Sequence, residues 1–152
     1  MKLEATISDI IQTLEDGQKG FASAAEKAEK DGRQDLAIEL RQYSDQRGMF
    51  SNELRTHAAE RGLEVDAGPS VAGTMHRGWM ALKDALSGDD VSGVLDVAEQ
   101  GEDHAVAEYA RAMDEDLDGE LRALLGQQFT EIQATHNRVR KLRDATNKAT
   151  NN

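Results

Sequence analysis

The chain has 152 residues, no cysteine, one proline and a formal net charge of −11. A chain of this length suits one domain with one hydrophobic core, so we expect a single domain over residues 1–152. The negative charge disfavours nucleic acids and anionic membranes as partners, because both attract clustered lysine and arginine. The lack of cysteine excludes disulfides, thiolate metal sites and thiol catalysis.

Neither a membrane span nor a signal peptide is expected from the sequence. No apolar run approaches the length of about 20 residues that crosses a bilayer. The opening residues MKLEATISDI lack the long apolar segment of a secretory signal. We therefore expect a cytoplasmic protein.

The first half of the chain predicts two long amphipathic helices. The first is predicted to begin after an N-cap at Thr6 and to end before Gly32, and the second to run from about 33 to 61. Their apolar stripes comprise Ile7, Ile10, Ile11, Leu14, Gly17, Phe21, Ala24, Ala25 and Ala28, then Leu36, Leu40, Tyr43, Arg47, Phe50, Leu54 and Ala58.

The second half predicts a connector and two further long helices. Residues 62–90 begin with the turn-forming run GLEVDAGPSVAG and continue into a short helix. Long helices follow at about 91–113 and about 120–146, and a polar tail from about 147 is expected to fray. Two short loops and one long connection favour an all-α, ferritin-like four-helix bundle, with the crossover between the second and third long helices. A simple up-down-up-down bundle is the alternative.

Polar residues interrupt the apolar stripes near the middle of the long helices. They are Arg47, Glu102 and Gln128, with His136 at the edge of its stripe. Counting residues from the loops places all of them at the same height in the bundle. A glycine on the first helix, Gly17 with or without Gly20, is predicted to leave room for the Arg47 side chain.

Two interpretations of this polar cluster remain open. In the first, Arg47 and Glu102 form a buried ion pair, and the other two side chains satisfy the remaining donors and acceptors. In the second, the cluster is a metal site of the di-iron type, which pairs each of two histidines with a glutamate three residues earlier. The residues at that position are Leu54, Gly73, Gly101 and Gln133, so the pattern is missing. We expect no metal, no cofactor and no catalytic residue.

Other candidate residues have simpler explanations. Glu53 and His57 lie off the apolar stripe and are predicted to be a solvated pair. We expect Asp16, Glu99 and Asp103 to be solvated in the same way. The short helix offers a docking feature or an anchor for the crossover, made of Met75, His76 and Trp79.

Five ordered motifs resemble the bacterial four-helix-bundle proteins of unknown function in the ferritin-like superfamily. They are DGQKGFASAAE at 16–26, RGMFSNEL at 47–54, HRGWMALK at 76–83, GEDHAVAEY at 101–109 and HNRVRKLRD at 136–144. The resemblance implies a ferritin-like fold without an established activity and supplies no catalytic residue.

Together these observations predict a structural or interaction protein, with a stress-related role implied by superfamily analogy alone. We expect a homodimer or other homo-oligomer, and a protein partner is a further expectation. The alternative function is an unconventional metal-binding oxidase, peroxidase or iron-storage protein.

Overall fold

The computed structural model describes residues 2–65, 78–88 and 90–150. The elements are α1 (Lys2–Lys30), α2 (Gln34–Glu60), α3 (Leu82–Leu86), α4 (Ser92–Met113) and α5 (Gly119–Thr150). The described part of the chain contains no strand, so the predicted all-α class is confirmed. Within these ranges, every helix is too short or too polar to cross a membrane.

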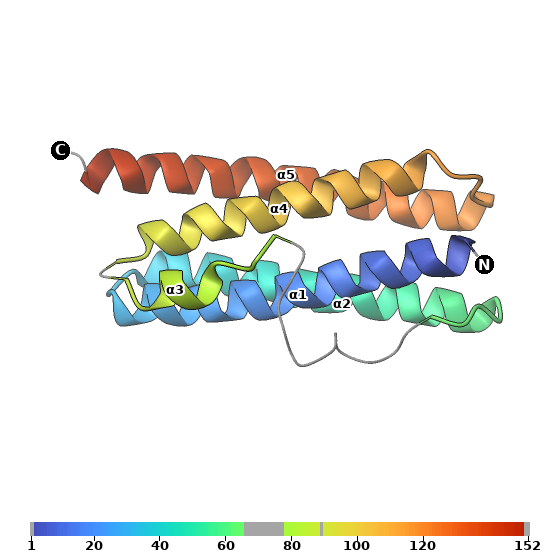
Figure 1. Ribbon diagram of the computed structural model, residues 1–152, viewed down its shortest axis with the longest axis horizontal. Coiled ribbons are helices and arrows are strands. Elements are labelled where there is room, and N and C mark those ends of the chain that lie inside the picture. Colours follow the sequence, from blue (N-terminus) through green and yellow to red (C-terminus); the bar gives the residue numbers. More distant parts are fainter. Residues whose placement is uncertain (1, 66–77, 89, 151–152) are drawn as a thin grey trace.

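The four long helices lie side by side as two antiparallel pairs (Figure 1). The first pair is α1 with α2, and the second pair is α4 with α5, which packs on the first mainly through contacts between α1 and α4. The connection between α2 and α4 starts at one end of the molecule and ends at the other, so these two helices run in the same direction (Figure 1). The short α3 lies in this connection and contacts α1 and α4.

The observed boundaries agree with the predicted ones except at two helix ends. Helix α1 already begins at Lys2, so the predicted N-cap at Thr6 is wrong. The Thr6 hydroxyl instead donates a hydrogen bond to Glu115 Oε2 at 2.7 Å, which ties α1 to the end of α4. Helix α5 continues to Thr150, beyond the predicted end near 146. The predicted stop at Gly32 is confirmed, because its φ of 78° lies in the left-handed region that favours glycine.

The hydrophobic core consists of two clusters at different heights in the bundle. One cluster contains Phe21, Leu40, Leu95 and Val139. The other contains Ile10, Leu54, Tyr109 and Ile132. On α1, α2 and α4 the buried residues between the clusters are polar or glycine, and they include Gly17, Arg47 and Glu102. A polar layer therefore separates the two apolar regions.

Trp79 fixes the end of the long connection to the bundle. Its side chain is 2% exposed and meets the Phe21 ring edge-on, with the centroids 5.1 Å apart. A Cβ atom added to Gly20 would lie 2.4 Å from Trp79 Cε3, and one added to Gly101 would lie 2.2 Å from Nε1. These two glycines form a slot for the indole ring, so Gly20 makes room for Trp79 and not for Arg47.

This position of Trp79 bears on the predicted docking feature. A buried ring offers no surface to a partner, whereas it suits the predicted crossover anchor. The two other residues of that prediction, Met75 and His76, lie outside the described residues.

Candidate functional site

Arg47 of α2 and Glu102 of α4 form an ion pair in the centre of the bundle. Arg47 Nη1 donates to Glu102 Oε1 at 2.5 Å, and Arg47 Nη2 donates to Glu102 Oε2 at 2.8 Å. Their side chains are 1% and 0% exposed. A two-pronged contact of this kind matches the planar guanidinium to both carboxylate oxygens. The pair forms the middle of the polar layer.

The surroundings of Arg47 fit its long side chain. Gly17 lies beside this side chain as predicted, but a Cβ atom added to it would lie 3.4 Å from Arg47 Nη1 and 3.6 Å from its Cγ, which is ordinary van der Waals contact, so Arg47 does not require a glycine there. The Arg47 guanidinium carbon lies 5.3 Å from the centroid of the Phe21 ring, within the range of a cation–π contact. Its Nε donates to Gln46 Oε1 at 3.4 Å. Carboxylate, aromatic ring and amide together replace the water that the guanidinium loses on burial.

Gln128 of α5 is buried but has other partners than the ion pair. Its Oε1 accepts a hydrogen bond from the Tyr109 hydroxyl at 2.7 Å, and its Nε2 donates to the Phe50 carbonyl at 3.3 Å. Burial raises the pKa of Tyr109 above its ordinary value, although the charge of Arg47 opposes the shift. The predicted cluster therefore separates into an ion pair and a neutral hydrogen-bonded group.

The pKa of Tyr109 leads to a prediction about alkaline solutions. Tyrosines in the unfolded chain ionise near a pKa of about 10, whereas folded Tyr109 keeps its proton to higher pH. The unfolded state therefore binds fewer protons in that window, and the free energy of unfolding should fall as the pH rises above about 10. Urea denaturation at about pH 9 and about pH 11 measures this loss. Tyr109→Phe should make the free energy of unfolding depend less steeply on pH in this range. An unchanged dependence on pH would contradict the assignment to Tyr109.

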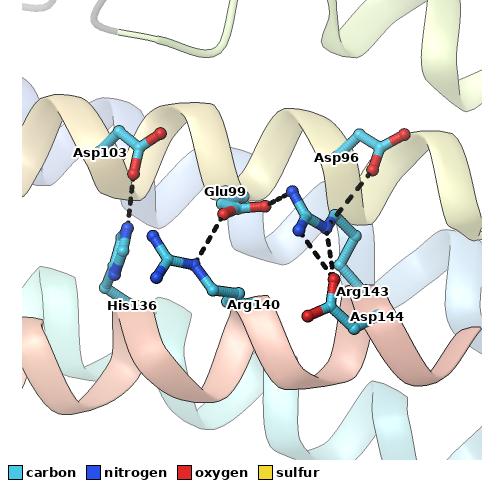
Figure 2. Close-up of polar contacts among 7 residues, drawn as sticks. All are labelled: Asp96, Glu99, Asp103, His136, Arg140, Arg143 and Asp144. Carbon is cyan, nitrogen blue, oxygen red and sulfur yellow. Dashed lines mark hydrogen bonds and ion pairs between the residues drawn. The ribbon is translucent and has the colours of Figure 1, made fainter. Parts of the chain in front are cut away.

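His136 does not join the buried cluster. Its Nε2 lies 2.5 Å from Asp103 Oδ1 on the outer side of α4 and α5, with side-chain exposures of 12% for His136 and 60% for Asp103. Figure 2 shows it at one end of a row of charged side chains between these helices. We call this row the α4–α5 cluster; it consists of Asp96, Glu99, Asp103, His136, Arg140, Arg143 and Asp144.

Glu99 is the central acid of the α4–α5 cluster. Arg140 Nε donates to its Oε1 at 3.1 Å, and Arg143 forms an ion pair with its Oε2 (Figure 2). Only 9% of the Glu99 side chain is exposed, so the predicted solvated position is wrong for this residue. The same prediction is wrong for Asp16, which is buried and accepts from Gln12 Nε2 at 3.1 Å.

Three members of the α4–α5 cluster have the atoms and the spacing to hold a metal ion. One ligand atom each from Glu99, Asp103 and His136 lies within 4.8 Å of the other two. The sequence criterion missed this group because it looked for a histidine and its glutamate on one helix. The sequence did contain one indication of this group: Glu99 and Asp103 are four residues apart on one helix, at the same height in the bundle as His136.

An open groove lies along the outer face of α2 and has a volume of about 710 Å³. We call it the α2 groove. Its lining residues are Gln18, Asp45, Gly48, Met49, Asn52, Glu53, Thr56, His57, Glu60 and Leu124. Exposed Glu53 and half-buried His57 both line it, and Glu53 Oε1 also accepts from Gln128 Nε2 at 3.4 Å.

Comparisons with known proteins identify a family but no activity. The family described as Domain of unknown function (DUF2383) matches residues 2–115, which is more than half of the chain. A comparison with curated proteins finds no significant match. The matched residues contain the ion pair and three acids of the α4–α5 cluster, Asp96, Glu99 and Asp103, whereas the cluster residues on α5 lie beyond them.

Proposed function

The chain belongs to the DUF2383 family, and from its geometry we propose a ferritin-like four-helix bundle that acts as an interaction protein, with the α2 groove as the binding surface. The composition of that groove carries the proposal. It combines an exposed apolar side chain with several carboxylates on one helix face.

The arrangement of the helices supports the ferritin-like part of the proposal. Two antiparallel hairpins joined by a long return connection are typical of that superfamily. Its metal-binding members carry their ligands in the bundle centre, the place that Arg47 and Glu102 occupy here. Both Glu102 oxygens are engaged by Arg47, and the fixed positive charge of Arg47 repels a cation. Chemistry at a central metal, the alternative predicted from the sequence, is therefore disfavoured.

The charge of the α2 groove indicates the kind of partner that it suits. Asp45, Glu53 and Glu60 supply three carboxylates, and Met49, which is 56% exposed, supplies an apolar contact. A basic, amphipathic segment of another protein complements both features. In a symmetric dimer both copies present the same surface to each other. A dimer formed through the α2 groove would therefore bring the carboxylates of the two copies together. The predicted homo-oligomer therefore needs a different surface.

Binding of a model peptide tests this proposal. A fluorescein-labelled amphipathic helix of lysine and leucine should bind the wild-type protein, and fluorescence anisotropy measures its Kd. The double variant Asp45→Lys, Met49→Asp should weaken binding at least tenfold, which corresponds to about 1.4 kcal/mol. Binding should also weaken as the salt concentration rises.

A matched variant distinguishes the groove from general attraction to an acidic protein. Met80 is 77% exposed and Asp84 is exposed, but neither lines the α2 groove. The variant Met80→Asp, Asp84→Lys changes the same residue types in the same way and should leave the Kd unchanged. Equal weakening by the two double variants would contradict the proposal.

A further inference from the structure

We propose that Glu99, Asp103 and His136 bind one divalent transition-metal ion of the Zn²⁺ class between α4 and α5. This inference does not depend on the α2 groove, because none of the three residues lines it. It concerns the outer side of the helix pair and not the bundle centre.

The backbone places the three side chains on facing surfaces. Glu99 and Asp103 are four residues apart, so both project from the same face of α4. His136 projects from α5 toward Asp103 (Figure 2). The three ligand atoms already lie within 4.8 Å of one another.

Only a small movement separates this arrangement from a coordination site. Atoms that share one tetrahedral Zn²⁺ at about 2.1 Å lie about 3.4 Å from one another. The contact of 2.5 Å between His136 Nε2 and Asp103 Oδ1 must therefore open by about 1 Å. Rotation of Asp103 provides this opening, because 60% of its side chain is exposed. Ligand atoms that lie as much as 4.8 Å apart must also approach one another by up to about 1.4 Å, which a small rotation of the Glu99 or His136 side chain supplies.

The donor atoms determine the class of ion. Imidazole nitrogen suits Zn²⁺, Fe²⁺ and Ni²⁺, whereas Mg²⁺ and Ca²⁺ prefer oxygen ligands throughout. Two carboxylates and one neutral imidazole also balance the charge of a divalent ion. Three protein ligands leave positions for water on the exposed side of Asp103.

Arg140 and Arg143 are the counter-ions of Glu99 in this structure, and the Arg140 guanidinium lies on the side of Glu99 that faces His136 (Figure 2). Both guanidiniums contact Glu99, and their side chains are 51% and 30% exposed. Both arginine side chains remain partly in water, where an ion pair stabilises a protein only weakly, so a metal ion can displace them from Glu99. Arginine and metal are therefore alternative counter-ions for the same carboxylate.

Isothermal titration of the chelator-stripped, untagged protein with Zn²⁺ tests the proposal, with Mg²⁺ as a second probe. We expect one Zn²⁺ per chain and at least tenfold weaker binding in both His136→Gln and Asp103→Asn. The second variant alters a side chain that is 60% exposed, so it keeps the test valid if His136→Gln does not fold. His57→Gln changes a histidine outside the α4–α5 cluster and should bind Zn²⁺ like the wild type.

The competing arginine gives a second, opposite readout. Arg140→Gln removes one counter-ion of Glu99 and should tighten Zn²⁺ binding severalfold. An interhelical ion-pair network without a metal function predicts no Zn²⁺ binding in any variant. That result would overturn the proposal, as would equal binding of Zn²⁺ and Mg²⁺ or unchanged affinity in both ligand variants.

Discussion

Replacing Glu102 with glutamine is expected to lower the free energy of unfolding by about 3 to 5 kcal/mol. The substitution keeps the size of the side chain but removes the charge that compensates Arg47. Because Arg47 is 1% exposed, its guanidinium would remain in the core without a counter-charge. Urea denaturation followed by circular dichroism measures the loss, and a loss below about 1 kcal/mol would contradict burial of the pair.

Removing both charges should be far less harmful than removing one. The double variant Arg47→Met, Glu102→Leu fills similar space without desolvating any charge, so we expect a stability close to that of the wild type or above it. An exposed pair serves as the control: Arg41 and Glu29 contact at 2.7 Å and are about half exposed. Glu29→Gln should cost less than about 1 kcal/mol. A double variant as unstable as Glu102→Gln would show that the pair itself stabilises the fold.

The position of this pair suggests what it contributes besides stability. Arg47 and Glu102 each occupy the gap between the two apolar clusters on their own helix. A shift of α2 against α4 by one turn, about 5.4 Å, would move both charges into apolar surroundings and separate them. The paired charges therefore favour one relative height of the two hairpins, a use that is known for buried polar groups in coiled coils.

The sequence predicted the helices, the height of the polar residues and, in one of two interpretations, the pairing of Arg47 with Glu102, but not the partners of Gln128 and His136. Repeats of 3.6 residues identify the buried face, and counting from the loops gives the level along the axis. Neither the periodicity nor the residue count shows in which direction a side chain points at a given height along the axis. Arg47 and Glu102 meet, whereas Gln128 bonds to Tyr109 and His136 points outward.

The wrong predictions concern features that a single helix pattern does not contain. Glu99 lies off the apolar stripe of α4, yet arginines from α5 cover it. Gly20 lies near Arg47 in the predicted height order, but the crossover brings Trp79 against it. Both errors arise from contacts between distant segments, which periodicity does not reveal.

Trp79→Ala is expected to lower the free energy of unfolding by about 3 to 5 kcal/mol, the usual cost of truncating a buried aromatic side chain. The ring joins the apolar cluster around Phe21 and holds the connection that leads into α3. Its loss removes these contacts and leaves a cavity between α1 and α4. Denaturant unfolding measures the effect. A change below about 1 kcal/mol would contradict the anchor and reopen the docking interpretation.

The glycine slot makes a sharper prediction, because the effect of one substitution should change sign with the background. Gly101→Ala in the wild type forces a Cβ atom to within 2.2 Å of Trp79 Nε1. Such overpacking should cost about 1 to 3 kcal/mol. In the Trp79→Ala background the clash is absent, so the helix propensity of alanine should make Gly101→Ala stabilising by up to about 1 kcal/mol.

Gly126→Ala is the matched control on α5, where the added Cβ has only an ordinary contact at 3.7 Å. Its effect should be the same in both backgrounds, whereas a Gly101→Ala effect that also stays constant would show that the indole does not occupy this slot.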